Sequence, residues 1–476
     1  MQSDINKKPT FYWIDYETWG VNPVTDRPCQ FAGIRTDEDL NIIGEPLVIY
    51  CQPPSDYLPV PEACLVTGIT PQLAMSKGLS EPEFMSKIHK ELSKPKTCTV
   101  GYNNVRFDDE VTRYSLYRNF IDSYAWAWKN GNSRWDLLDV MRACYALRPD
   151  GINWVYNEDG LPSFKLEKLS IANGIEHASA HDALSDVIAL IELAKVVKKA
   201  QPKLFDYLFK HRNKNELKKL VDITNNKPLV HVSGMFGASR NNTSWIIPVI
   251  DHPTNNNSVI AIDLAMNPAP LLDLNADELR DRLYTKRDEL SEDELPVPIK
   301  TISLNKFPIL TTAKALTADD SKRIGLDRDK CLESLRLLQG SMSVIRSKLY
   351  ELFVNEPEYP KSGNVDTQLY DGFFTPADRV SMDTILSTKP ENLAALDVTA
   401  NDDRIPKLLF NYRARNFPHT LDEKDVRRWN NHRSEYFEAH GFQFMESIER
   451  LATEHEHDDK KVHILQELVR YAQSLT

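Results

Sequence analysis

Two acidic residues stand two positions apart at the end of an apolar stretch near the N-terminus, in Ile14-Asp15-Tyr16-Glu17-Thr18. Side chains alternate between the two faces of a strand, so in a strand Asp15 and Glu17 point the same way. Neighbouring carboxylates repel each other, and a hard divalent cation such as Mg²⁺ would neutralise them because it prefers carboxylate oxygens. The pair therefore predicts a metal site. A solvated strand end is the alternative that the pair alone leaves open.

Two later segments add residue types that such a site would need. Asp108 follows a predicted strand and starts a predicted helix, where by itself it also fits a helix cap or a first-turn residue. His181 and Asp186 open a long predicted helix. Residues five apart diverge by about 140° on a regular helix, so these two side chains converge only if His181 lies in the loop before the first turn.

The elements that must position these residues follow an α/β pattern over the first 200 residues. Runs of aromatic and branched residues predict strands over 11–15, 30–36, 46–52 and 97–102. Helical periodicity covers 82–93, 107–119, 135–147, 166–173 and 183–199. Strands followed by alternating helices favour a mixed sheet flanked by helices.

The pattern changes twice later in the chain. After Ala200-Gln201-Pro202, short β-like runs dominate over 229–232, 245–250, 259–263 and 297–304, with a charged helical insertion at 276–290. Two prolines and a glycine between 356 and 363 mark a second break, beyond which the chain has a helical pattern to Thr476. We therefore expect three domains, at 1–200, 201–356 and 357–476.

The acidic residues form an ordered set, Asp-x-Glu, a mid-domain Asp and His-x4-Asp, which extends over about 170 residues. This set resembles the DEDDh, or DnaQ-like, 3′→5′ exonucleases. Six further phrases resemble the bacterial exonuclease I family, namely GYNNVRFDDE (101–110), WDLLD (135–139), HVSGMF (231–236), NVD (364–366), QLY (368–370) and FNYRARN (410–416). The resemblance covers essentially the whole chain. It implies an α/β, ribonuclease H-like exonuclease domain, a β-rich SH3-like domain and an all-helical C-terminal domain.

The resemblance also implies roles for the acidic set. Asp15, Glu17, Asp108 and Asp186 would hold two Mg²⁺ ions, for which Mn²⁺ can substitute, Glu17 would also contact substrate, and His181 would be the general base. Two ions about 4 Å apart can activate water and neutralise the phosphoryl oxygens and the leaving oxygen. A histidine that titrates near neutrality can take the proton of the water.

The expected activity is processive 3′→5′ hydrolysis of single-stranded DNA to 5′-mononucleotides, in DNA repair and recombination. Two other interpretations remain open. One is an RNA-trimming exoribonuclease of the same superfamily, because exclusion of the 2′-hydroxyl depends on pocket shape. The other is a single-strand-binding adaptor without catalysis, against which the intact acidic set argues.

Basic and aromatic residues alternate densely between 113 and 135. Proteins that bind single strands place basic groups along the backbone and aromatic rings under the bases. We predict that part of this run contacts the strand and part is core, and we choose Arg113, Tyr124 and Trp128 as contacts, with Arg142 from the following helix.

Three further substrate contacts are expected. Lys165 precedes the helix predicted at 166–173 and is placed to contact a terminal nucleotide, although the position also fits a residue that merely precedes a helix. Gln368 and Tyr370, in the C-terminal domain, rest mainly on the resemblance.

The segment 195–219 carries a local charge of +7 in a chain whose net charge is −11. A charge run of this kind can be a solvated helical face. Aromatic residues interrupt this run, however, so it can also form a groove that is both basic and apolar. Such a groove suits an acidic peptide with a hydrophobic end. The exonuclease I resemblance implies such a partner, the acidic C-terminal tail of single-stranded-DNA-binding protein. Arg148, Tyr207 and Lys227 are the expected contacts.

The composition and the absence of certain motifs exclude several other classes of protein. No run of 18 uncharged apolar residues occurs, and the first ten residues are polar, so we expect neither a membrane span nor a signal peptide. Six cysteines without a CxxC pair favour a reducing cytoplasm. GxxxxGK[ST] is absent, which argues against a P-loop ATPase. We expect a monomer.

Overall fold

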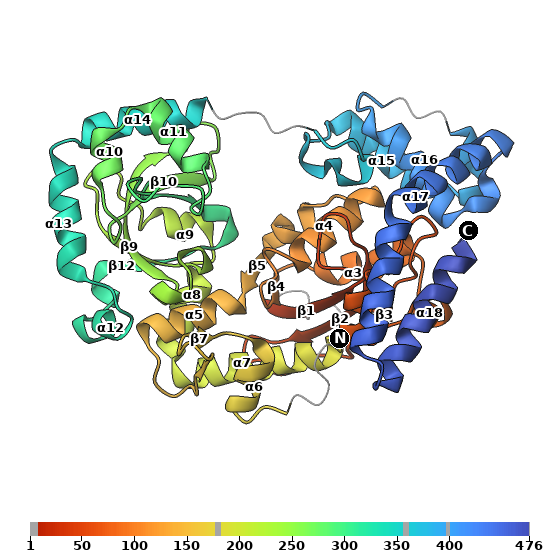
Figure 1. Cartoon of the computed structure of the whole chain (residues 1–476), viewed down its shortest axis with the longest axis horizontal. Coiled ribbons are helices and arrows are strands. Elements are labelled where there is room, and N and C mark those ends of the chain that lie inside the picture. Colours follow the sequence, from red (N-terminus) through yellow and green to blue (C-terminus); the bar gives the residue numbers. More distant parts are fainter. Residues whose placement is uncertain (1–7, 177–181, 356–360, 397–399, 476) are drawn as a thin grey trace. The chain divides into compact units, whose positions relative to one another are not determined.

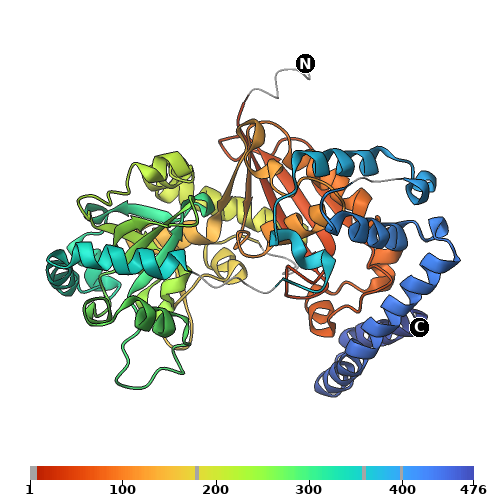
Figure 2. The same ribbon diagram turned by 90° about the horizontal axis from the view of Figure 1, so that it is seen from above.

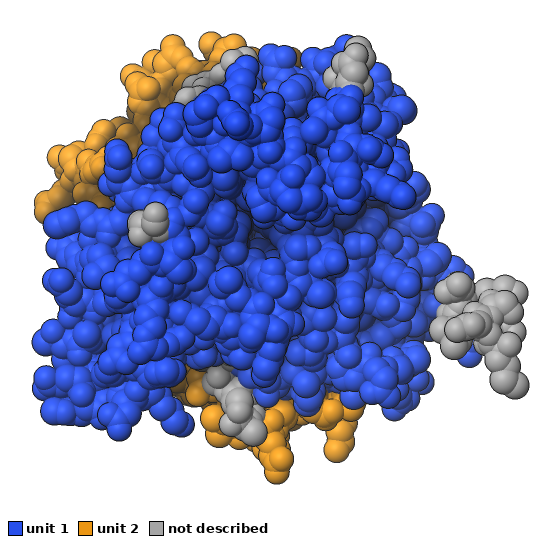
Figure 3. Space-filling view, turned by 90° about the vertical axis from the view of Figure 1, so that its right-hand side faces the viewer, with its two compact units in different colours: residues 1–133, 177–191, 360–476 blue, residues 134–176, 192–359 orange. Residues whose placement is uncertain are grey.

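The computed structural model describes residues 8–176, 182–355, 361–396 and 400–475. The chain forms two compact units, each assembled from separate segments. Unit 1 comprises Met1–Ser133, His177–Ile191 and Pro360–Thr476, and unit 2 comprises Arg134–Glu176 and Glu192–Tyr359. On the face drawn in Figure 3, unit 1 forms one continuous surface although it joins segments from both ends of the chain.

The sheet that carries the acidic pair has the strand order β3-β2-β1-β4-β5. Its strands are β1 (Thr10–Thr18), β2 (Pro28–Thr36), β3 (Leu47–Tyr50), β4 (Thr97–Gly101) and β5 (Ser133–Asp136). β1 pairs antiparallel with β2 and parallel with β4, which makes the sheet mixed, as predicted. All residues of β1 except Asp15 are buried. The strand continues past its predicted end at 15, so Glu17 lies within it.

Four helices accompany this sheet within unit 1: α1 (Pro61–Thr67), α2 (Pro71–Lys77), α3 (Glu81–Leu92) and α4 (Asp108–Arg118). Of these, α3 and α4 are labelled in Figure 1. The sequence reasoning missed α1 and α2, although each begins with a proline and is followed by a glycine, the residues that often start and stop helices. Helix α3 buries one apolar face, with Phe84 and Ile88, against Ile14 of β1 and Phe31 of β2. Helix α7 (Ala183–Ala200) begins in unit 1 and ends in unit 2.

The C-terminal segment is helical, as predicted, and it shares its core with the N-terminal segments. Its helices are α15 (Pro376–Ser387), α16 (Arg404–Asn416), α17 (Glu423–Glu454) and α18 (Asp459–Leu475), and α17 and α18 lie side by side in Figures 1 and 2. Leu369 and Ile405 pack in one cluster with Tyr117 from α4. Phe444 from α17 packs in another cluster with Trp19, which follows β1. These helices therefore complete the core that holds the sheet.

Unit 2 contains a second, antiparallel sheet with the strand order β11-β10-β9-β8-β12. Its strands are β8 (Leu229–Val232), β9 (Thr243–Asp251), β10 (Ser258–Asp263), β11 (Ile299–Ser303) and β12 (Ile309–Thr312). Four of the five coincide with predicted runs. The helices of this part are α10 (Ala269–Asp273), α11 (Ala276–Tyr284), α12 (Ala318–Arg323), α13 (Arg328–Gln339) and α14 (Met342–Val354).

Two predicted helices differ at their ends. The helix expected at 135–147 begins later, as α5 (Leu137–Leu147), because Trp135 and Asp136 belong to β5 and the Asp136 carboxylate accepts a hydrogen bond from the Leu138 amide at 3.0 Å. The insertion expected to be helical to 290 ends at Tyr284. Unit 2 also contains β6 (Val155–Tyr156), β7 (Pro162–Ser163), α6 (Leu166–Ala172), α8 (Pro202–Lys210) and α9 (Lys214–Lys218).

None of the helices that the structure describes is long and apolar enough to cross a membrane. The six cysteines are all buried free thiols.

Candidate active site

Three carboxylates meet in unit 1. Asp15 and Glu17 lie on the same face of β1, and Asp186 lies in the first turn of α7. One carboxylate oxygen from each residue lies within 4.8 Å of the others. Glu17 is 9 % exposed, and Asp15 is partly buried. The pair predicted from strand periodicity and the acid predicted to start a helix are thus brought together.

Asp108 lies beside this group. It is the first residue of α4 and is buried, and its Oδ1 accepts a hydrogen bond from the backbone amide of Tyr16 at 3.2 Å. Because Tyr16 separates Asp15 from Glu17 in β1, this bond ties the start of α4 to the acidic part of the strand. The four predicted acids therefore converge. His181 lies outside the described residues.

Crowding changes the acidity of these groups. Burial, and then repulsion from Asp108, Glu17 and Asp186, raise the pKa of Asp15 well above its usual range. Burial, followed by the charges of Asp186 and Asp108, raises the pKa of Glu17 to about 8. Burial and the neighbouring Asp109 raise the pKa of Asp108 to about 7. Without a cation, the cluster therefore retains protons near neutral pH.

A divalent cation suits this donor set. Coulomb's law with an effective dielectric constant of about 20 gives roughly 3.5 kcal/mol of repulsion for two unit charges 4.8 Å apart. Three such pairs among Asp15, Glu17 and Asp186 make the fully ionised cluster costly, and carboxylate oxygens are the ligands that hard cations prefer. Bound cations in such a site lower the pKa of water and neutralise the phosphoryl oxygens.

A buried amide on β2, missed by the sequence reasoning, holds the start of α7. Gln30 is opposite Glu17 in the β1–β2 register and is 2 % exposed. Its Nε2 donates to Oδ1 of Asp182, and its Oε1 accepts from the amide of Ala183, both at 3.4 Å. Asp182 also accepts a hydrogen bond from the Ser185 hydroxyl at 3.1 Å. Gln30 thus connects the strand beside Glu17 to the turn that carries Asp186.

A second buried group, also missed, supports the start of α4. Asp109 is fully buried, accepts a hydrogen bond from Nδ2 of Asn104 at 3.2 Å and donates its own amide to the carbonyl of Asn104 at 2.8 Å. Thr112, one turn later, donates to the hydroxyl of Tyr16 at 3.0 Å. The only signal for these roles was the unusual density of polar residues around Asp108.

Comparison with known proteins identifies the family. Sequence models of three families match: an exonuclease family over residues 12–194, an exonuclease I SH3-like domain over 212–355 and an exonuclease I C-terminal domain over 363–475. Exodeoxyribonuclease I of Escherichia coli (strain K12) is 54 % identical over 476 residues, which cover all of both chains. The chain belongs to the exonuclease I family. It is therefore an exodeoxyribonuclease, and the predicted family and three-part fold class are confirmed.

Other exonuclease I proteins agree. The relative from Haemophilus influenzae is 51 % identical over 97 % of this chain and 98 % of its own. The structure of E. coli exonuclease I in complex with a dA16 oligonucleotide matches with a TM-score of 0.96 at 54 % identity, covering 98 % of this chain and all of that one. A zinc-bound form of an E. coli exonuclease I–single-stranded DNA complex, with the same coverage, matches at 0.94 and 54 % identity. A structure of SSB/exonuclease I with an inhibitor matches at 0.93 and 53 % identity, covering 99 % of this chain and all of that one.

Several expected strand contacts of this exonuclease I family member lie together in unit 1. Arg113 donates to Glu110 at 2.6 Å and to the hydroxyl of Tyr370 at 3.2 Å, and that hydroxyl donates to Glu110 at 2.5 Å. The Arg113 guanidinium lies 5.7 Å from the ring centre of Tyr124. Arg113 is thus held in a fixed position by its partners. Tyr124 and Tyr370 have ring centres 6.5 Å apart.

The remaining expected contacts differ in exposure. Trp128 is 66 % exposed, whereas Gln368 is partly buried and donates its amide to the carbonyl of Ser362. In unit 2, Arg142 pairs with Asp139 at 2.8 Å, and Lys165 is exposed immediately before α6. Trp135 belongs to the same run of basic and aromatic residues, but it is buried in the core. Its ring packs edge-on against that of Phe205, with the ring centres 5.1 Å apart.

The three expected partner contacts all belong to unit 2. Arg148 donates to the carbonyl of Ala315 at 3.0 Å. The Tyr207 hydroxyl donates to the carbonyl of Leu310 at 3.1 Å. Lys227 is exposed.

Proposed function

We propose that this exodeoxyribonuclease degrades single-stranded DNA from the 3′ end and releases 5′-mononucleotides, with two Mg²⁺ ions held by Asp15, Glu17, Asp108 and Asp186. The observation that carries the proposal is the convergence of carboxylate oxygens within 4.8 Å on β1 and α7, with Asp108 bonded to the same strand. Mn²⁺ can substitute for Mg²⁺, because both accept carboxylate and water ligands.

We assign His181 as the general base, which takes a proton from the attacking water. It precedes Asp182, whose carboxylate is tied to Gln30, so the chain enters α7 beside Glu17. We assign the terminal nucleotide to Glu17 and Lys165. The remaining strand contacts are Arg113, Tyr124, Trp128, Arg142, Gln368 and Tyr370.

Processive action is part of the proposal. Basic and aromatic candidates occur in both units, with Trp128 in unit 1 and Arg142 and Lys165 in unit 2. Many backbone contacts keep the strand bound while the terminal phosphate is cleaved, and they make affinity fall with salt. The E. coli relative whose structure is similar was crystallised with oligonucleotides, which supports DNA as the substrate.

We also propose that the basic segment 195–219 binds the acidic tail of single-stranded-DNA-binding protein, through Arg148, Tyr207 and Lys227. Support comes from the similar solved structure of SSB/exonuclease I with an inhibitor. A role in DNA repair and recombination, a monomeric state and a cytoplasmic location complete the proposal, and the six free buried thiols suit a reducing compartment.

Digestion of end-labelled oligomers tests the activity. Single-stranded DNA, duplex DNA and RNA of one sequence are incubated with Mg²⁺ or EDTA, and products are resolved by length and terminal group. We expect Mg²⁺-dependent release of 5′-mononucleotides from the 3′ end of single-stranded DNA alone. Preferential degradation of RNA would support the exoribonuclease alternative instead, and binding without cleavage would support the adaptor.

A further inference from the structure

Glu110, the third residue of α4, holds two of the expected strand contacts at once. Its Oε1 accepts a hydrogen bond from Nη1 of Arg113 at 2.6 Å, and its Oε2 accepts one from the hydroxyl of Tyr370 at 2.5 Å. Nη1 of Arg113 also donates to that hydroxyl at 3.2 Å. The three side chains form a closed set, in which Glu110 ties α4 to the 3-10 helix η8 (Val365–Tyr370) of the C-terminal segment.

The cation in this set is mostly covered, whereas the ring is open. Arg113 is 9 % exposed, and its charge is paired with that of Glu110. Tyr370 is 54 % exposed. Bases of a single strand stack on exposed aromatic rings, so the ring of Tyr370 offers the strand more surface than Arg113 does. The Arg113–Glu110 pair supplies an anchor for the hydroxyl end of that ring.

Neighbouring aromatic rings surround the exposed ring of Tyr370. It packs edge-on against Tyr114 of α4, with ring centres 5.8 Å apart, and its centre lies 6.5 Å from that of Tyr124. The ring of Tyr124 in turn lies 6.0 Å from that of Phe373, which is 83 % exposed. Aromatic pairs at these distances attract each other. The rings therefore form one cluster, and Glu110 is bound to its Tyr370 edge.

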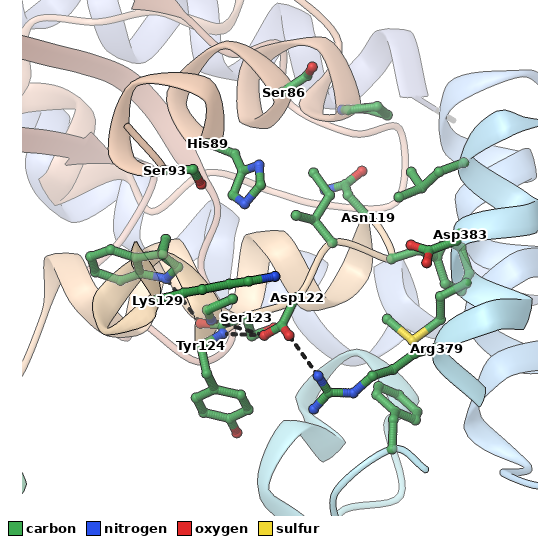
Figure 4. Close-up of a pocket in the computed structure, with 18 of the residues that line it drawn as sticks. Ser86, His89, Ser93, Asn119, Asp122, Ser123, Tyr124, Lys129, Arg379 and Asp383 are labelled. Carbon is green, nitrogen blue, oxygen red and sulfur yellow. Dashed lines mark hydrogen bonds and ion pairs between the residues drawn. The ribbon is translucent and has the colours of Figure 1, made fainter. Parts of the chain in front are cut away.

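The backbone of Tyr124 is anchored separately from its ring. Oδ1 of Asp122 accepts a hydrogen bond from the amide of Tyr124 at 2.9 Å, and its Oδ2 accepts one from Arg379 of α15 at 2.9 Å (Figure 4). The Tyr124 ring is contacted instead by the Arg113 guanidinium, which lies 5.7 Å from the ring centre. Because Glu110 binds that guanidinium, it acts on the ring of Tyr124 as well.

We propose that Glu110 is a positioning residue for strand binding, which holds the rings of Tyr370 and Tyr124 in place before the strand arrives. The inference rests on the proposed function, in which both tyrosines contact the strand. Ordering a side chain during binding lowers affinity, so rings that are already held bind bases more tightly. Arg113 neutralises the charge of Glu110, which limits the repulsion between this acid and the phosphates.

This role predicts an effect opposite in sign to that of charge alone. The phosphate backbone of the strand is anionic, so removal of an acid from the binding surface would strengthen binding if only charge mattered. Removal of Glu110 should instead weaken binding, because the Tyr370 hydroxyl and the Arg113 guanidinium lose their acceptor. An acid that is needed to bind a polyanion therefore identifies a positioning role.

Anisotropy titrations of labelled oligo-dT with the full-length protein in EDTA measure the effect without turnover. Glu110→Gln removes the charge, and Glu110→Asp keeps the charge but shortens the side chain that bridges the two partners. We expect both variants to weaken binding by about threefold to tenfold, the range for ordering one aromatic side chain during binding. The matched control is Asp371→Asn, which removes an acid next to Tyr370 and should not weaken binding. Oδ2 of Asp371 has no hydrogen-bond partner among the described residues.

A double-mutant cycle assigns the effect to the hydroxyl of Tyr370. Tyr370→Phe keeps the ring and removes the hydroxyl, so it should weaken binding in the wild type. It should add little in the Glu110→Gln background, because the two groups act through one contact. Fully additive losses would contradict the proposal, since Glu110 would then act independently of Tyr370.

Two readouts separate positioning from damage to the metal site. Mg²⁺ should raise the melting temperature of Glu110→Asp by as much as it raises that of the wild type. With Mg²⁺ present, KM for the oligomer should rise while kcat stays close to that of the wild type. Loss of the Mg²⁺ effect would place Glu110 in the metal site and overturn the positioning role. If Glu110→Gln does not melt like the wild type, Glu110→Asp and Tyr370→Phe decide.

Tyr370→Ala distinguishes failure of this inference from failure of the proposed function. If Tyr370→Ala weakens binding while both Glu110 variants bind like the wild type, or Glu110→Gln binds more tightly, only the positioning role is wrong. If Tyr370→Ala itself binds like the wild type, the strand contact assigned to Tyr370 is wrong, and the role of Glu110 is refuted with it.

Discussion

Replacing Glu17 with Gln should stabilise the metal-free protein at alkaline pH. Glu17 is 9 % exposed, and its carboxylate lies within 4.8 Å of oxygens from Asp15 and Asp186. Its pKa is raised from an ordinary value of 4.5 to about 8, first by burial and then by neighbouring acids. The folded state therefore binds this proton more tightly than the unfolded state does.

The sign and size follow from proton linkage. Below about pH 4.5, Glu17 is protonated in both the folded and the unfolded state, so it does not lower the free energy of unfolding. Between pH 4.5 and 8 stability falls as pH rises, because only the unfolded state ionises freely, and above pH 8 the loss stays constant. At about 1.4 kcal/mol for each pH unit, the full loss is on the order of 5 kcal/mol. An unfolding entropy of about 2.1 cal/mol/K per residue converts this into about 5 °C for a chain of 476 residues.

Thermal melts from pH 4.5 to 9 in EDTA measure the effect, with Glu45→Gln at an exposed position as the matched control. The melting temperature of Glu17→Gln should exceed that of the wild type by about 5 °C above pH 8 and by almost nothing at pH 4.5. In Mg²⁺ the order should reverse, because the wild type gains cation binding that the variant lacks. A pH-independent difference, or an equal one in Glu45→Gln, would refute the crowded-carboxylate argument.

Three other substitutions test separate parts of the site. His181→Ala should lower the cleavage rate by about 10²–10⁴ at neutral pH and recover partly at higher pH, without loss of oligomer binding; an unchanged pH–rate profile would exclude a general base. Gln30→Leu should misplace a metal ligand, and should therefore lower kcat by roughly tenfold and raise the Mg²⁺ concentration needed for thermal stabilisation. The control is Gln52→Leu, which loses two amide hydrogen bonds, at 3.0 and 3.1 Å, outside the site and should change neither quantity. Trp128→Ala should weaken single-strand binding by about 1–3 kcal/mol in an anisotropy titration while leaving metal-induced stabilisation intact.

The carboxylates could be predicted from the sequence because strand periodicity alone places Asp15 and Glu17 on one face. The ordered set then predicted Asp108 and Asp186 for the same site; in the structure Asp186 has a carboxylate oxygen within 4.8 Å of the pair, and Asp108 accepts a hydrogen bond from the Tyr16 amide between them. No comparable rule identifies Gln30, since an isolated glutamine in an apolar strand has no periodic signature. Its role depends on the β1–β2 register and on where α7 starts, and both are determined by the tertiary structure.

The ends of helices also depend on tertiary structure and could not be predicted from the sequence. Trp135 and Asp136 continue a helical pattern in sequence, yet they pair as β5, because the edge of the sheet takes an extended strand there and Asp136 then caps α5. Tertiary packing decided each of these features.

The shared core of unit 1 leads to a final prediction, that a chain ending at Lys199 does not fold into a stable nuclease. Truncation would expose side chains such as Trp19 and Tyr117, which are 1 % exposed and pack against C-terminal helices. Each large apolar side chain loses roughly 1.5–3 kcal/mol of burial. The buried Arg27 would also lose Asp366, its ion-pair partner at 2.7 Å, and an unpaired buried charge costs about 3–5 kcal/mol.

The losses at these three residues alone add up to roughly 6–11 kcal/mol, which is of the same size as the 5–15 kcal/mol by which a typical domain is stable. Circular dichroism and thermal melts of the truncated chain should therefore show no cooperative transition. Adding residues 361–476 as a separate chain should restore one, because the missing face of the core is then supplied in trans. A cooperative melt and Mg²⁺-dependent cleavage of short oligomers by the truncated chain alone would show that the sheet and its carboxylates are held without the C-terminal helices, and that those helices serve strand binding only.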